Sequence, residues 1–149
     1  MHLVESNLRQ WDLEDATRDP GASDAQVANA KREIDRLNVS RHRLVEQIDA
    51  AIDSVLDQSA SALPATESPG MVLDRLSVLV IRRARTETAS CRDPKLVDRV
   101  RALQAQVGAL SAALDSYMDE LRAGTRRFVR YQSLKLYGPS TEAAGSAKE

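Results

Sequence analysis

Apolar residues recur at alternating spacings of three and four residues along two long segments of the chain. The first stripe consists of Val27, Ala30, Ile34, Leu37, Leu44, Ile48, Ala51 and Val55. The second stripe consists of Leu96, Val100, Leu103, Val107, Leu110, Leu114, Tyr117 and Leu121. Because this spacing brings the apolar residues to one face of a helix, it predicts two long helices that each bury one side.

The ends of these two helices carry recognisable signals. Ser23 with Gln26 is typical of a capping box, and Asp93 before Pro94 is typical of a helix start. Gly124 is the kind of residue that follows the last turn of a helix. We therefore expect one helix to begin at the capping box, and the other to begin at the Asp-Pro pair and stop at the glycine.

A third segment, from 71 to 81, is apolar on every side instead of striped. Ser68 as N-cap and Pro69 as the first helical residue predict that a helix begins here. A basic run, Arg82, Arg83 and Arg85, is expected to close it, because cations are favoured near a helix C-terminus. A helix without a polar face is expected to lie buried between other helices.

Shorter elements complete the predicted fold. A short helix is expected over 3–17, and the basic segment 128–137 is a candidate fifth helix. Together the segments predict an all-α antiparallel helical bundle with two long heptad-striped helices, a buried central helix and short terminal helices. We expect one domain over 1–137 and a disordered tail over 138–149. The long helices exceed what the short ones can cover, so a homodimer is expected.

Charged residues interrupt the apolar pattern at two places. Asp74 and Arg75 lie inside the third segment, and Arg41 occupies the seam position between Leu37 and Leu44. A buried charge costs several kcal/mol unless it is paired and hydrogen-bonded. One interpretation is a polar pocket, in which the arginines bind a carboxylate or phosphate and Asp74 orients them or acts as a base. The other is an ion-pair network that fixes helix register, and the sequence leaves both open.

Under the pocket interpretation, the candidate catalytic residues are Asp74, Arg75 and Arg41. The candidate ligand-binding residues are Asn38, Glu67, Ser77, Lys135 and Trp11. Lys135 would then lie on a segment that closes over an anionic ligand, and Glu14 or Asp15 would lie at the pocket mouth. Each also has a structural explanation: Glu67 as a helix cap, Lys135 as C-terminal packing, and Trp11 as the anchor of a short helix.

Composition narrows the classes of function. The net charge of −1 and an aromatic content of 3% argue against partners such as nucleic acid or an anionic membrane. The single cysteine, Cys91, fits a reducing cytoplasm, which is the expected location. Di-iron bundles need Glu-x-x-His pairs, and the chain has none, so no metal is expected. The sequence lacks a phosphate-cradling glycine loop, and no cofactor is expected either.

A series of motifs follows in a characteristic order. The motifs are Trp11-x-x-Glu14-Asp15, Lys31-x-x-Ile34-Asp35-x-x-Asn38-x-x-Arg41, Ile48-Asp49, Glu67-Ser68-Pro69-Gly70-x-x-x-Asp74-Arg75-Leu76-Ser77 and Tyr131-Gln132-x-x-Lys135-x-Tyr137. Over residues 5–138 this order resembles a bacterial family known as domain of unknown function 4254. The resemblance implies a place in specialised-metabolite or glycan biosynthesis, without an established activity.

The chain departs from the pattern of that family at three places. The resemblance implies a histidine after the tryptophan, where Asp12 stands, and an aromatic-histidine pair where Ala84 and Arg85 stand. It also implies Asn-Asp after the last tyrosine, where Gly138 stands. Any chemistry that histidines perform in the family is therefore not expected of this chain.

These observations predict a small cytoplasmic helical protein of a bacterial biosynthetic pathway, with an internal polar pocket for an anionic small molecule. Whether it is an enzyme is left open. The alternative is a non-catalytic dimeric interaction or scaffold module for a biosynthetic enzyme. A further alternative comes from the segment 30–46, whose arginines are similar to those of helical chorismate mutases, although the lysine expected about three turns later is missing.

Overall fold

The computed structural model describes residues 2–133 and is mostly helical. Four helices follow one another: α1 (Leu3–Ala16), α2 (Asp24–Asp53), α3 (Pro69–Ser90) and α4 (Val97–Arg122), with a 3₁₀ turn η1 (Pro94–Leu96) before α4. Two short strands, β1 (Leu63–Pro64) and β2 (Arg126–Arg127), pair in parallel. The helical class is confirmed, whereas the small strand pair was not expected.

The predicted helix starts carry the expected hydrogen bonds. The Ser23 backbone N–H donates to Gln26 Oε1 at 2.8 Å at the start of α2. The Met71 N–H donates to Ser68 Oγ at 3.4 Å at the start of α3. Asp93 caps the turn η1 instead of α4 itself. Gly124 follows α4 with a φ of 70°, a left-handed conformation that glycine adopts without strain.

Two boundaries differ from the prediction. Helix α3 continues to Ser90 instead of ending in the basic run, because the arginines of that run pair with other side chains: Arg83 with Glu87, and Arg85 with Asp12. Helix α2 ends at Asp53, so Val55 lies beyond it and is 80% exposed. The basic run therefore lies inside α3, where Arg83 pairs within the helix and Arg85 pairs with α1.

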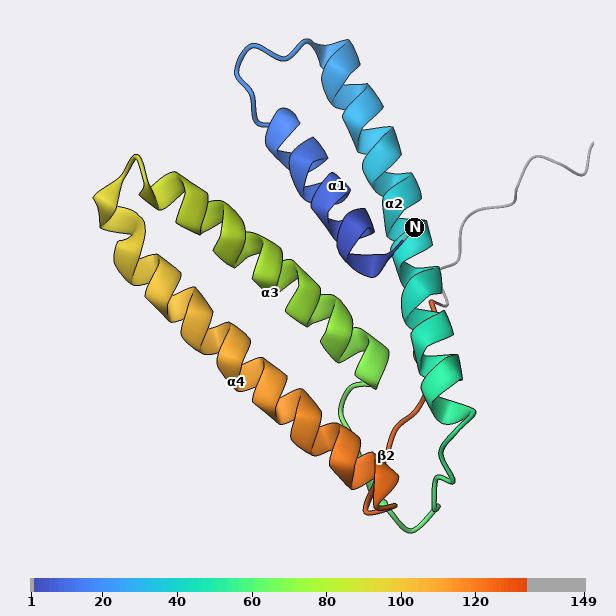
Figure 1. Ribbon diagram of the computed structural model, residues 1–149. Helices are drawn as coiled ribbons and strands as arrows, with labels where there is room; N and C mark the ends of the chain where they lie inside the picture. Colours follow the sequence, from blue (N-terminus) through green and yellow to red (C-terminus); the bar gives the residue numbers. More distant parts are fainter. Residues whose placement is uncertain (1, 134–149) are drawn as a thin grey trace, which may run out of the picture.

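The helices form two hairpins (Figure 1). Helix α1 packs against α2, and α3 packs against α4; α3 also contacts both α1 and α2. Helix α4 lies on the outer side of α3 and, among the described elements, otherwise contacts η1 and β2. Because α4 does not reach α1 or α2, the four helices of one chain do not enclose a common core. The predicted antiparallel bundle is thus not confirmed in its details.

The apolar stripes supply six of the buried apolar residues: Ala30, Ile34, Leu37, Leu103, Leu114 and Leu121. The others are Val45, Val72 and Ile81 on the helices, and Ala62 and Phe128 in the connecting segments. Helix α3 is the most centrally placed helix, yet it is not buried all round: Val80 is 39% exposed. Part of the apolar surface of α3 therefore stays uncovered by the other helices of the same chain.

As far as residue 133, the segment that follows β2 is not helical and is hydrogen-bonded to side chains of α2 and Gln58. The Phe128, Tyr131 and Ser133 N–H groups donate to Gln58 Oε1 (2.6 Å), Asp49 Oδ2 (2.9 Å) and Glu46 Oε1 (2.7 Å). A helix would have used these N–H groups internally. Residues 134–149, which include Lys135 and the predicted tail, lie outside the described residues.

Asp49 joins three parts of the fold and is fully buried. Besides the Tyr131 N–H, it accepts a hydrogen bond from the Gly70 N–H at 2.7 Å, at the start of α3. A Cβ atom on Gly70 would lie 2.7 Å from Asp49 Oδ1 and 2.8 Å from the Val45 carbonyl oxygen. The glycine is therefore required by the close approach of α3 to α2.

Candidate functional site

A polar cluster connects α1 to α3 in the interior of the molecule. Asn7 is 5% exposed, and its Nδ2 donates to Asp74 Oδ1 at 2.9 Å and to Ser77 Oγ at 2.6 Å. The Ser77 hydroxyl in turn donates to the Asp74 carbonyl oxygen at 2.8 Å. The sequence singled out Asp74 and Ser77, and the structure adds Asn7 as the residue that joins them to α1.

Arg41 of α2 extends this cluster to a third helix. Its Nε lies 3.8 Å from Asp74 Oδ1, and the two side chains are 24% and 22% exposed. Asp74 thus faces Arg41 and not its neighbour Arg75. The pair is partly solvated and loosely spaced, so its cost of burial is smaller than the sequence alone suggested.

A cavity of about 260 Å³ opens beside this cluster, between α1, α2 and α3. Its lining consists of Asn7, Gln10, Trp11, Glu14, Arg18, Arg41, Val78 and Arg82. Three of these side chains are guanidinium groups and one is a carboxylate, so the wall carries an excess of positive charge. The cavity contains two of the residues predicted for a pocket, Arg41 and Trp11, and Glu14 as a residue of its wall.

The cations of this wall are not equally paired. Arg18 lies 3.1 Å from Asp15 and 3.6 Å from Glu14, both on α1. Arg41 has Asp74 at 3.8 Å. The Arg82 guanidinium has no carboxylate within 4.0 Å among the described residues. An anion entering the cavity would therefore meet at least one guanidinium that is free to bind it.

Three side-chain oxygen atoms of α1 are buried without a hydrogen-bond partner within residues 2–133. They are Ser6 Oγ, Asn7 Oδ1 and Gln10 Oε1. Buried polar atoms are almost always paired, so an unpaired one needs an explanation. None of the three residues was predicted, because a lone polar side chain on a short polar helix has no pattern that distinguishes it from a solvated one.

Arg75 and Glu67 lie apart from this cavity. Arg75 Nη2 and Glu67 Oε2 are 3.0 Å apart, and the arginine side chain is 58% exposed. Both line a second cavity of about 430 Å³ at the base of α3 and α4. The Tyr117 hydroxyl donates to the Glu67 carbonyl oxygen there at 2.9 Å. Burial, followed by the nearby Asp49 carboxylate, raises the pKa of Tyr117 to about 12.

A third cavity, of about 730 Å³, is a groove between α3 and α4. Its lining is mainly apolar, with Asp74, Arg75, Arg82 and Gln106 at its polar positions. Asp74 therefore borders both this groove and the α1 cluster. Asn38, the remaining described candidate, is half-buried one turn before Arg41 and is not part of the cavity wall beside it.

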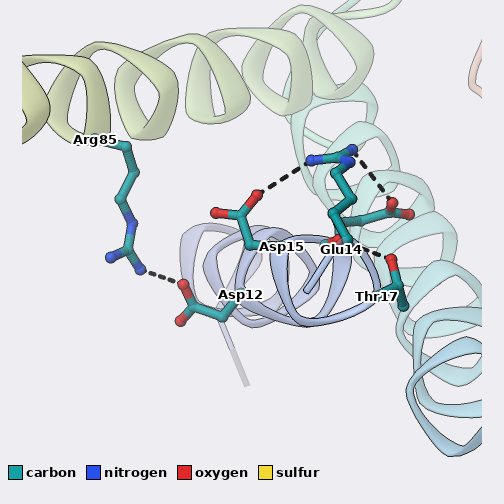
Figure 2. Close-up of polar contacts among 6 residues, drawn as sticks. Asp12, Glu14, Asp15, Thr17 and Arg85 are labelled. Carbon is teal, nitrogen blue, oxygen red and sulfur yellow. Dashed lines mark hydrogen bonds and ion pairs between the residues drawn. The ribbon is translucent and has the colours of Figure 1, made fainter. Parts of the chain in front are cut away.

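The cleft between α1 and α3 continues past Trp11. Trp11 and Arg82 also line a neighbouring cavity of about 240 Å³ with Asp15 and Arg85. Arg85 reaches across from α3 to form an ion pair with Asp12 on α1 (Figure 2). Positions 12 and 85 are two of the places where the chain departs from the family pattern, so the two departures face each other.

Two further kinds of feature, a metal site and a membrane-spanning helix, are missing from the described residues. Within residues 2–133, His, Cys, Asp and Glu side chains form no group of three or more that is suited to a metal ion. Each described helix is too short or too polar to cross a bilayer.

Comparison with known proteins gave one match. A family model with the description "protein of unknown function (DUF4254)" matches residues 1–129. Neither a curated protein nor a solved structure matches the chain.

Proposed function

We propose that this chain, which belongs to the DUF4254 family, binds a small anionic molecule in the cavity between α1, α2 and α3. The observation that carries the proposal is the wall itself: three guanidinium groups against one carboxylate around about 260 Å³. Guanidinium groups bind carboxylates and phosphates through paired, charge-assisted hydrogen bonds. The cellular setting that we propose is a cytoplasmic bacterial biosynthetic pathway, which the family resemblance implies.

The residues in and beside the cavity wall have different roles in this proposal. Arg41 and Arg82 bind the anion, and Trp11 forms the apolar side of the cavity. Asp74 acts as a positioning residue, because it touches both Arg41 and Asn7. Arg75 and Glu67 are left out, since they pair with each other at a different cavity.

Titration calorimetry with inorganic phosphate and succinate tests the proposal. Arg41→Met and Arg82→Met are each expected to weaken binding by about tenfold or more, because a hydrogen bond to a charged group contributes roughly 1.5–3 kcal/mol. Arg75→Met is the matched control and should bind like the parent. Parent protein that binds neither anion, or equal losses in all three variants, would contradict the proposal.

A second candidate function is a dimeric interaction module. The supporting observation is the groove of about 730 Å³ between α3 and α4, with Val78, Leu79 and Leu110 in its wall. Since α4 contacts neither α1 nor α2, a second copy of the chain that packs on this groove would complete an antiparallel bundle. We propose a homodimer of this kind as the alternative to ligand binding, or as its companion.

A further inference from the structure

We infer that the ligand bound beside Arg41 has a second anionic group, and that it is an elongated bis-anion whose apolar middle lies across Trp11. The inference rests on the proposed function, and it identifies the class of ligand. It comes from a second cavity that adjoins the first, and from arginines in its wall that have no partner.

Two cavities adjoin at Trp11 and Arg82. One is the cavity of about 260 Å³ that contains Arg41, here the Arg41 cavity. The other is the cavity of about 240 Å³ that contains Arg99, here the Arg99 cavity. Trp11 and Arg82 belong to the walls of both. A ligand that passes these two side chains therefore reaches both cavities.

The residues of α3 give the separation of the two cavities. Val78 lines the Arg41 cavity but not the Arg99 cavity, and for Thr86 the reverse holds. Arg82 lies halfway between them along the helix. At a rise of 1.5 Å per residue, Val78 and Thr86 are about 12 Å apart along α3. A single phosphate or carboxylate is too small to occupy both cavities at once.

The Arg99 cavity contains guanidinium groups that no carboxylate of the described chain neutralises. Most arginines within residues 2–133 form an ion pair, but Arg82 and Arg99 have neither an ion-pair partner nor a hydrogen-bond partner for their guanidinium groups there. The other charged residues of this wall, Asp15 and Arg85, are each in an ion pair. An anion can therefore bind in the Arg99 cavity without breaking an existing pair.

Positive charge is in excess along the two cavities together. Their walls hold five guanidinium groups and two carboxylates: Arg18, Arg41, Arg82, Arg85 and Arg99, with Glu14 and Asp15. Like charges that face one cleft are unfavourable for each other unless an anion lies among them. One anionic group in the Arg41 cavity leaves Arg99 without a partner, whereas a second group in the Arg99 cavity supplies it.

The junction between the cavities favours an apolar link between the two anionic groups. The indole of Trp11 lines both cavities and offers a flat apolar surface. Val78 on the Arg41 side and Leu96 on the Arg99 side add apolar wall. Burial of a hydrocarbon segment against these side chains is favourable. The ligand is thus anionic at both ends and apolar between them.

The test compares ligands that differ in the number and spacing of their anionic groups. Calorimetry would measure hexane-1,6-diol bisphosphate against hexyl phosphate, which has the chain and one phosphate. Inorganic pyrophosphate has two phosphates that are too close together to reach both cavities. The bisphosphate is expected to bind about tenfold or more tightly than either, because its second contact forms within one complex. Octanedioate replaces both phosphates by carboxylates and shows which anion is preferred.

Variants assign this advantage to the Arg99 cavity. Arg99→Met should reduce the affinity for the bisphosphate to that for hexyl phosphate, and should leave the binding of hexyl phosphate as in the parent. Arg101→Met is the matched control, because Arg101 is exposed on α4 and pairs with Asp98 at 3.0 Å. It should keep the advantage in full.

Three results overturn this inference alone. They are hexyl phosphate or pyrophosphate that binds as tightly as the bisphosphate, an advantage that survives Arg99→Met, and an advantage that Arg101→Met removes equally. Failure of every anion to bind, inorganic phosphate included, overturns the proposed function with it.

Discussion

Arg41 shows how a single residue can be located by a pattern and still be misjudged in its environment. Its position in the heptad stripe correctly placed it toward the interior. The stripe could not show that the seam opens there into a cavity, which leaves Arg41 and Asp74 about one quarter exposed. The cost of burying charge is lower in such a setting, so the residue is compatible with a binding role.

The stability of Arg41→Met separates the two interpretations of this charge. We expect the free energy of unfolding in urea to change by less than about 1 kcal/mol, because the pair is partly exposed and spaced 3.8 Å apart. Asp74 also keeps its hydrogen bond from Asn7. A loss of roughly 3 kcal/mol would instead indicate a structural ion pair whose partner is left buried without compensation.

Tyr117 gives a prediction about alkaline pH. Its pKa is raised from 10.0 to about 12, chiefly by burial and then by the Asp49 carboxylate. The folded protein therefore holds the phenol proton more tightly than the unfolded chain does. This contribution to stability is complete below about pH 10 and is lost as the pH rises toward 12.

Absorbance of tyrosinate in a pH titration measures this directly. One tyrosine should ionise near pH 12, and Tyr117→Phe should remove that component. The same variant should flatten the decline in the free energy of unfolding between pH 10 and 12. A titration in which all tyrosines ionise near pH 10 would be inconsistent with the buried phenol.

The facing pair Asp12 and Arg85 is a second lesson at the residue scale. The resemblance places histidines at both positions, and this chain has a carboxylate and a guanidinium there that form an ion pair between α1 and α3. In this chain the carboxylate and the guanidinium at these positions join α1 to α3.

At the scale of elements, helix starts were predictable and several other features were not. Start signals are local: a side-chain oxygen and an N–H three residues on, as at Ser23 and Ser68. Helix α3 ends at Ser90, beyond the basic run that was expected to close it. The non-helical course of the segment after β2 depends on Glu46 and Asp49 of α2, which accept its N–H groups. The hydrophobic periodicity of a segment does not reveal hydrogen-bond partners that lie on another element.

The junction of α2 and α3 makes a prediction about glycine. Gly70→Ala should lower the free energy of unfolding by about 1–3 kcal/mol, because the added Cβ meets Asp49 and the Val45 carbonyl at under 3 Å. Gly108→Ala is the control: nothing lies within 4 Å of its Cβ, and it is inside α4.

The free energy of unfolding should rise in the control variant, Gly108→Ala. Alanine is favoured over glycine in a helix interior by roughly 0.5–1 kcal/mol, so Gly108→Ala is expected to stabilise the protein. Urea denaturation of both variants gives the two signs. Equal effects of the two substitutions would show that the approach of α3 to Asp49 is not as close as described.

On the scale of the whole molecule, the structure brings together some of the predicted site residues and separates others. Arg41, Asp74, Ser77 and Trp11 were identified because each breaks or marks a pattern, and they do converge. Asn7, Gln10 and Arg82 were missed. Helix α1 packs inward with Ser6 and Asn7 while Val4 and Leu8 are exposed, the reverse of what an amphipathic pattern assumes.

The open arrangement of the hairpins predicts the behaviour of the molecule in solution. If a second copy covers the α3–α4 groove, sedimentation should give a dimer, and Leu110→Glu should give a monomer, because a charge in an apolar interface is costly. Val129→Glu, at an exposed position (76%) outside the groove, should remain a dimer. A monomeric parent protein would contradict the dimer proposal.

The buried Asp49 also has a consequence for the order of events when the chain folds. Its two hydrogen bonds join residues 21 and 82 positions apart in sequence, and the contact of Ser133 with Glu46 spans 87. Loops of such length close slowly compared with a helical hairpin. The hairpins α1–α2 and α3–α4 are therefore expected to form before the segment after β2 docks on α2. Until it does, the buried Asp49 carboxylate has only the hydrogen bond from Gly70 and lacks the one from Tyr131.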